Sequence, residues 1–239
     1  MSPTITGADP ADLKRDLALA CRILGANGHG DSIFGHVSAR APGGDRFWMK
    51  AQHLGLEEAT EGDLVLLDYD GNVLDGSRSP HREFPIHAEV LRARADVACV
   101  VHTHPPFSVA LGARRLEIRP VGHEGALFWP PGVPLFEEFT DLVKTTAQGR
   151  RVAETLGGGI ALLLRNHGIV VAASSIPLAT IAAITLEKAA RMQLLAQPTA
   201  DTEIAYTPAD EAVRKRDIWS PDAVAAQWRY YGRKVGSAG

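Results

Sequence analysis

"SPHREFPIHAEVLRARADVACVVHTHPPFS", residues 79–108, predicts a helix that is followed at once by a strand. Ser79 is the expected N-cap and Pro80 the expected first helical residue, because serine accepts free N–H groups of a first turn and proline adds none. The apolar run "VACVVHTH" then predicts the strand, and two prolines end it. Two histidines are therefore expected where this strand ends.

His102 and His104 lie two residues apart in the expected strand, so their side chains should share one face, roughly 6–7 Å apart at the backbone. That spacing suits two imidazole ligands of one metal ion, and a site that keeps a position for substrate takes a third protein ligand. Without a metal, the pair would be two hydrogen-bonded histidines at a strand end. The histidines that could complete a ligand set are His81, His87, His123 and His167.

Downstream, "IALLLRNHGIVVAA", residues 160–173, predicts two strands joined by a tight turn at residues 166–168. His167 stands out as a third ligand, because a side chain at such a turn can project from the sheet. A buried helix is expected from the mostly apolar stretch 175–197 that follows. Another helix is expected before these strands, from about 141 to 156.

Upstream of residue 79, the pattern favours one helix and several antiparallel strands. The amphipathic helix has Asp9 as its expected N-cap and Pro10 as its first residue, and it should end near Gly25. The expected strands are "IFGHVSAR", "RFWMK", "DLVLLDY" and "NVLDG". The segments "APGGD" and "DYDGN" between them are typical of hairpin turns.

The composition favours a single domain over residues 1–239, with a C-terminal helical tail from about residue 209. Of the 239 residues, 45% are hydrophobic, which is enough for one sizeable core. The formal net charge of -3 argues against a nucleic-acid partner. No secretory signal pattern and no apolar run long enough for a membrane span is found, so a cytoplasmic location is expected. Cys21 and Cys99 are expected as small core residues.

Glu83 falls in the first turn of the expected helix, four residues before His87 and on the same face. A carboxylate there could bind a metal or carry a proton. Alternatively, it would stabilise the helix N-terminus beside a surface histidine.

Together these motifs resemble the class II aldolase/adducin family. The glutamate-bearing helix, the histidine pair and the later Asn-His-Gly turn of "LLLRNHGIVVAASSIPLATIAAITLEKAARMQLLAQ" occur in the family's order. The resemblance runs from the first helix to about residue 197. It implies an α/β fold, a three-layer α/β/α sandwich with a largely antiparallel central sheet. It also implies a homotetramer with sites near the subunit interfaces.

The resemblance also implies roles for individual residues. His102, His104 and His167 would bind one divalent metal ion per chain, with zinc as the usual ion and manganese or cobalt also suited to a chelating hydroxy acid. Glu83 would be the catalytic acid and base. The residues that would close over the metal, from the tail or from a neighbouring chain, are His123 and Tyr231.

The sequence departs from the family's sugar-phosphate aldolases at the three elements that hold phosphate. His36 stands where those enzymes have an asparagine, and Lys50 lies in a segment that lacks their Thr-Gly pair. His81 and Arg82 replace two serines directly before the glutamate, and the planar guanidinium of arginine matches a carboxylate. These four residues are therefore predicted to bind a non-phosphorylated carboxylate. The alternative is that His81 and Arg82 face solvent or a neighbouring subunit.

The resulting expectation is a metal-dependent carbon–carbon lyase. The residues before the metal strand resemble those of the family's decarboxylases of hydroxylated phthalates and of a pyridine dicarboxylate. A class II aldolase that cleaves a hydroxy-keto acid or a sugar phosphate would share every ligand, so it is the alternative. An epimerase or dehydratase fits less well, since those relatives mostly act on sugar phosphates. An adducin-like scaffold without activity is expected to have lost the ligand set, which is intact here.

Overall fold

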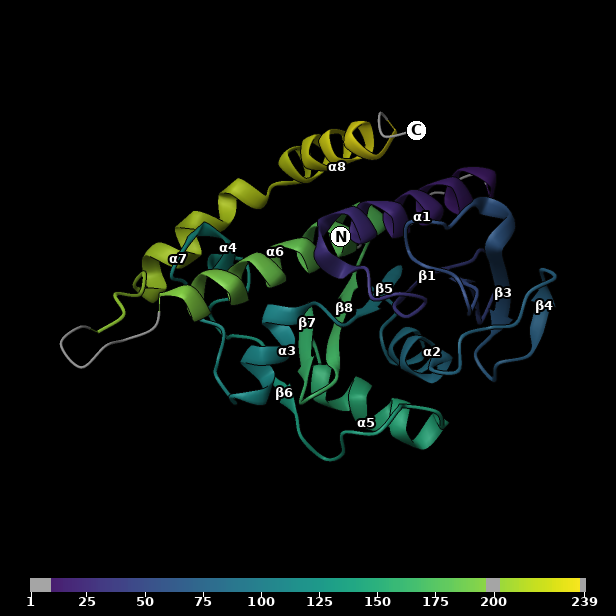
Figure 1. Ribbon diagram of the computed structural model, residues 1–239, viewed down its shortest axis with the longest axis horizontal. Helices are drawn as coiled ribbons and strands as arrows, with labels where there is room; N and C mark the ends of the chain where they lie inside the picture. Colours follow the sequence, from purple (N-terminus) through teal and green to yellow (C-terminus); the bar gives the residue numbers. More distant parts are fainter. Residues whose placement is uncertain (1–9, 197–202, 237–239) are drawn as a thin grey trace.

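The computed structural model describes residues 10–196 and 203–236, and these are organised around one eight-stranded sheet (Figure 1). The strand order is β4-β3-β2-β1-β5-β8-β7-β6, and neighbouring strands are antiparallel except for the parallel pair of β6 and β7. The strands are β1 His36–Arg40, β2 Arg46–Lys50, β3 Leu64–Asp68, β4 Val73–Asp75, β5 Cys99–Thr103, β6 Leu135–Phe136, β7 Ala161–Leu164 and β8 Gly168–Ala173.

Helices cover both faces of this sheet. In Figure 1, α1, α6 and α8 lie above the sheet, and α2 and α5 lie below it. The helices are α1 Pro10–Leu24, α2 Phe84–Ala93, α3 Pro106–Ala113, α4 His123–Ala126, α5 Thr146–Leu156, α6 Ile176–Leu195, α7 Ala209–Lys215 and α8 Pro221–Gly236. The expected α/β/α sandwich with a largely antiparallel sheet is confirmed.

Two apolar cores fill the spaces between the layers, because successive side chains of a strand point to opposite faces. On β5, Cys99 and Val101 pack into the core shared with α1 and α6, while Val100 packs into the core shared with α2 and α5. Cys21 and Cys99 are both fully buried thiols, as expected.

The helix before β5 begins later than predicted. α2 starts at Phe84, with Glu83 at the N-cap position and Pro85 in the first turn, so the assignment of Ser79 and Pro80 was wrong. The carbonyl of Ser79 instead accepts a hydrogen bond from the N–H of Gln52, which ties this segment to the loop after β2. Either Pro80 or Pro85 could occupy the first turn of a helix. The hydrogen bond between Gln52 and Ser79 holds the segment around Pro80 outside the helix, so Pro85 lies in the first turn.

Other boundaries also differ from the prediction. α5 begins at Thr146 and not near residue 141, because Thr145 and Gln148 form a reciprocal capping box at that point. The prolines after β5 end the strand as predicted, but they also open α3. The short elements α4 and β6 were not predicted from the Pro- and Gly-rich stretch that contains them.

The two ends of the described chain agree with the prediction where they can be compared. α1 begins at Pro10 and ends at Leu24, whereas Asp9, its predicted N-cap, lies outside the described residues. The helical tail begins at Ala209 and continues through α8. Among the described residues, no helix is both long and apolar enough to cross a membrane.

Candidate metal centre

One end of the sheet brings together the side chains that the sequence marked as ligands. His102 is in β5, His104 follows its end, His167 is in the turn between β7 and β8, and Glu83 directly precedes α2. One ligand atom from each of these four residues lies within 4.8 Å of the ligand atoms of the others. The predicted histidines and the predicted carboxylate thus form one cluster.

The distances show which atoms face one another. The Nε2 atoms of His102 and His104 are 3.2 Å apart. The Nε2 atom of His102 lies 3.7 Å from Oε2 of Glu83, and Nε2 of His167 lies 3.6 Å from Oε1. The three imidazoles therefore direct the same nitrogen toward a common point beside the carboxylate.

Two of these rings are oriented through their other nitrogen. His102 donates from Nδ1 to the carbonyl of Ile169 at 2.9 Å, and His104 donates from Nδ1 to Oδ2 of Asp31 at 2.9 Å. A proton on Nδ1 leaves a lone pair on Nε2, which is the form that a metal requires. Asp31 was not identified from the sequence, because it lies 73 residues from His104 and belongs to no recognisable motif.

The turn that carries His167 depends on its neighbours. Asn166 has a φ of 56°, in the left-handed region that asparagine tolerates better than most residues. A Cβ atom at Gly168 would lie 2.4 Å from the carbonyl oxygen of Thr103 and 2.7 Å from Cδ2 of His104. Only glycine therefore lets β8 start this close to the end of β5.

The donor set fits a divalent metal ion. Nε2 of His167 is buried and has no hydrogen-bond partner, so it is available as a ligand. Burial lowers the pKa of His102 below its ordinary value and lowers the pKa of His104 to about 4, which keeps both rings neutral at physiological pH. Three neutral imidazoles with a neighbouring carboxylate are typical of zinc sites and also serve manganese and cobalt.

Glu83 is almost completely buried, with 2% of its surface exposed. Oε1 accepts a hydrogen bond of 2.8 Å from the backbone N–H of Val143, a contact that the sequence did not predict. Burial opposes ionisation of the carboxylate, but the neighbouring imidazoles of His102, His167 and His36, 3.6–3.9 Å away, lower its pKa well below the ordinary value. In the metal-free protein the group is thus a carboxylate that faces three histidines.

A second group of predicted residues adjoins this carboxylate. His36 is fully buried, and its Nε2 atom lies 3.9 Å from Oε2 of Glu83. The ring of His81 lies against that of His36, with centroids 3.8 Å apart and the ring planes tilted by 40°. Arg82 is exposed next to them. The structure therefore places His36 and His81 against Glu83, with Arg82 at the rim.

The other residues assigned to the substrate lie elsewhere in this chain. Lys50 is fully buried, and its ammonium group donates to the carbonyls of Ala51 and Leu54, so its hydrogen bonds stabilise the loop after β2. His123 is exposed at the start of α4. The hydroxyl of Tyr231 accepts a hydrogen bond from Lys188, within the core beside α6.

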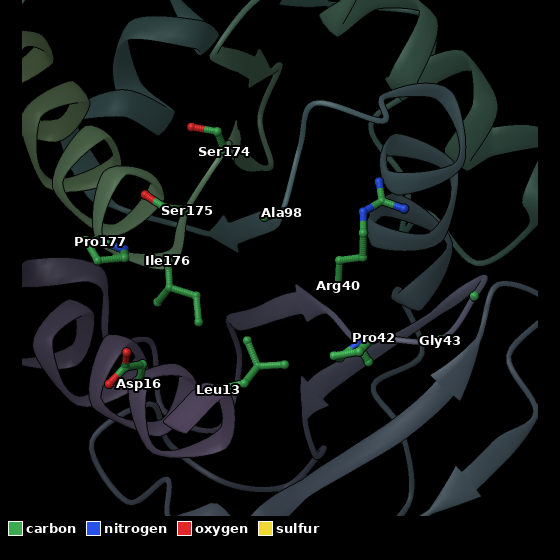
Figure 2. A pocket seen from close by; sticks show the side chains of 12 residues that line it. Leu13, Asp16, Arg40, Pro42, Gly43, Ala98, Ser174, Ser175, Ile176 and Pro177 are labelled. Carbon is green, nitrogen blue, oxygen red and sulfur yellow. The ribbon is translucent and has the colours of Figure 1, made fainter. Parts of the chain in front are cut away.

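A cavity of about 560 Å³ lies at the opposite end of the same strands (Figure 2). Its lining is mainly apolar, and Figure 2 shows Arg40 pointing away from the space toward the neighbouring helix. The guanidinium of Arg40 donates to three backbone carbonyls and to the hydroxyl of Tyr69. Among the residues that line this cavity, no free cationic group is thus left to bind an anion, and the histidine cluster lies at the other end of the strands.

The buried histidines predict an acid-sensitive fold. Burial lowers the pKa of His29 to about 3 and the pKa values of His81 and His104 to about 4, against 6.5 in the unfolded chain. Between these values the unfolded chain binds more protons, so stability rises with pH in this window. The free energy of unfolding of the metal-free protein should be highest above pH 6.5 and fall by several kcal/mol toward pH 4.

Urea titrations at a series of pH values measure this dependence. Replacing the exposed His53 with Gln is the matched control and should leave the slope unchanged. A free energy of unfolding that stays constant from pH 7 to pH 4.5 would contradict the prediction.

The chain is similar in sequence and in fold to known enzymes. The family described as "Class II Aldolase and Adducin N-terminal domain" matches residues 15–194. The chain is 30% identical over 250 residues to 3,4-dihydroxyphthalate decarboxylase from Arthrobacter keyseri, with 100% of both chains covered. It is 31% identical to 3,4-dihydroxyphthalate decarboxylase from Terrabacter sp. (strain DBF63), with 92% of this chain and 95% of that one covered. L-fuculose 1-phosphate aldolase from Glaciozyma antarctica has the same fold, with a TM-score of 0.84 at 23% identity over 99% of this chain and 95% of that one.

Proposed function

Because the chain belongs to the class II aldolase and adducin family, we propose that it is a metal-dependent decarboxylase of a non-phosphorylated, hydroxylated aromatic or heteroaromatic dicarboxylate. The observation that carries this proposal is the convergence of three imidazole nitrogens on Glu83, with His81 beside that carboxylate and Arg82 exposed at the adjacent position of the chain. The decarboxylase relatives, which match over nearly their full length, support the same reaction class.

One divalent metal ion per chain would be held by His102, His104 and His167. When bound, it supplies a Lewis acid that stabilises negative charge on an oxygen of the substrate. Zinc suits this set, and manganese or cobalt would also serve.

Glu83 is positioned to move the proton. Its carboxylate would first take the proton of the substrate's ring hydroxyl and would then donate that proton to the ring carbon that carries the departing carboxylate. The bond between that carbon and the carboxylate then breaks, carbon dioxide leaves, and the electron pair returns to the ring, which regains its aromaticity. Glu83 is left ionised beside the substrate, ready to accept the next proton.

His81 and Arg82 would bind the second carboxylate of the substrate. Arg82 can donate two parallel hydrogen bonds to it, whereas tetrahedral phosphate suits smaller donors. Contact of His123 or Tyr231 with the substrate would require a neighbouring subunit, and we propose a homotetramer on the basis of the family resemblance.

The double substitution His81→Ser with Arg82→Ser should raise KM for the dicarboxylate about 30-fold while the metal content stays the same. Loss of a charge-assisted pair costs on the order of 2 kcal/mol here, at the low end of the range for such contacts, because Arg82 is exposed and screened by solvent. Steady-state kinetics with a hydroxyphthalate and a hydroxypyridine dicarboxylate measure the effect.

Arg78→Ser is the matched control, because Arg78 is a nearby arginine whose guanidinium pairs with Asp63 at 2.8 Å. It should leave KM unchanged. An unchanged KM in the double variant would contradict the proposal that His81 and Arg82 bind the second carboxylate.

A further inference from the structure

Three polar side chains form a hydrogen-bonded row that leads to Glu83. Ser38 Oγ lies 2.7 Å from Nδ1 of His87, and Nε2 of His87 lies 2.6 Å from Nδ1 of His36. Ser38, His87 and His36 are all fully buried. Buried polar groups are costly unless they are paired, so a continuous row of three fully buried polar side chains indicates a specific role.

The row ends on an atom without a hydrogen bond. Nε2 of His36 is buried and has no partner within hydrogen-bond distance, and Oε2 of Glu83 lies 3.9 Å away. The register of the sheet fixes this position, because His36 on β1 pairs directly with His102 on β5. A shift of the carboxylate by roughly 1 Å would bring the two atoms within hydrogen-bond distance.

The direction of the protons along the row follows from the charge at its end. Nε2 of His87 and Nδ1 of His36 share one hydrogen bond, which needs one ring as the donor and the other as the acceptor, and a neutral imidazole carries a single N–H. If Ser38 donates to His87, then His87 donates to His36, and Nε2 of His36 presents its N–H to Glu83. The opposite arrangement would direct a lone pair at a carboxylate, which is repulsive. The first arrangement is therefore favoured beside an ionised Glu83.

We infer that Ser38, His87 and His36 position the catalytic carboxylate, with the N–H of His36 holding Oε2 while the N–H of Val143 holds Oε1. A metal ion on the histidine cluster would take the Nε2 lone pairs of His102 and His167, so neither ring could donate to Glu83 in that state. The inference rests on the proposed function of Glu83. His36 is then a positioning residue, and His87 and Ser38 act through it.

The first test determines which ring nitrogens of His36 and His87 carry protons, and it does not depend on enzymatic activity. Long-range ¹H–¹⁵N spectra of the imidazoles, recorded on the metal-free and the metal-loaded protein, should show His36 and His87 protonated at Nε2. In Ser38→Ala, the signal of His87 should change because its Nδ1 atom loses its donor. Protonation of His36 at Nδ1 in the unsubstituted protein would overturn the inference. This result holds whichever reaction the enzyme catalyses, so failure of the row and failure of the proposed function are distinguishable.

The second test compares His87→Gln with His87→Leu. The glutamine amide can still donate to Nδ1 of His36, whereas leucine cannot. His87→Leu should lower kcat on the order of tenfold at unchanged KM and metal content, and His87→Gln should recover most of it. Ser38→Ala gives the same comparison if His87→Leu does not fold.

Thr180→Val is the matched control for the loss of a buried hydroxyl, because Thr180 bonds only within α6, to the carbonyl of Ile176. It should lower stability and leave kcat unchanged. Equal kcat values in the leucine variant, the glutamine variant and the unsubstituted protein would show that the row is structural only.

Discussion

Glu83→Gln is expected to lower kcat by about 10²–10⁴-fold while the fold and the metal content are retained. The amide fills the same buried space, and its oxygen can still accept the hydrogen bond from the N–H of Val143. It cannot supply an acidic proton to the ring carbon of a substrate. Steady-state kinetics and metal analysis on the same preparation separate the two effects.

Glu89→Gln is the matched control, because Glu89 is a second buried carboxylate on α2, where it pairs with Arg92 and Arg150. It should alter stability and leave kcat of the folded enzyme intact. If Glu83→Gln turned over substrate as fast as the unsubstituted protein, Glu83 would only be the residue that precedes a helix.

His102→Ala, His104→Ala and His167→Ala are each expected to weaken metal binding by more than about 100-fold. Each substitution removes one of three imidazole ligands and leaves two imidazoles, with Glu83 as the remaining donor of the cluster. Asp31→Asn should have a smaller effect, about 10–100-fold, because Asp31 orients His104 without binding the metal.

Metal content after dialysis and competition with a chelator measure these affinities. The control is His53→Ala, which removes an exposed histidine outside the cluster. About one metal ion per chain in all three ligand variants would contradict the assignment of the site.

The histidine cluster could be predicted from the sequence because the spacing of its members is local. Two histidines at alternate positions of a strand end must share a face, and a histidine in a tight turn must project from it. The structure brings both features to one end of the sheet. The three-layer arrangement was implied by the resemblance to the family and is confirmed.

The features that the sequence did not predict depend on contacts between segments that are distant in the chain. α2 starts at Phe84 because a loop from another part of the chain binds the residues that precede it. Lys50 was assigned to the substrate from its position, yet the loop after β2 uses all the hydrogen bonds found for its ammonium group. Asp31 and the backbone of Val143 reach the site only through tertiary folding. No pattern in a single sequence reports such pairings.

The fate of the substrate's carboxyl carbon distinguishes a decarboxylase from an aldolase. The purified, metal-loaded protein is incubated with 3,4-dihydroxyphthalate labelled in both carboxyl groups, and the labelled carbon dioxide is collected. The proposed decarboxylation predicts one equivalent of carbon dioxide for each molecule of dicarboxylate consumed, with the second carboxylate retained in the product. No carbon dioxide from this acid or from a hydroxypyridine dicarboxylate, together with efficient release of an aldehyde from a sugar phosphate, would contradict it.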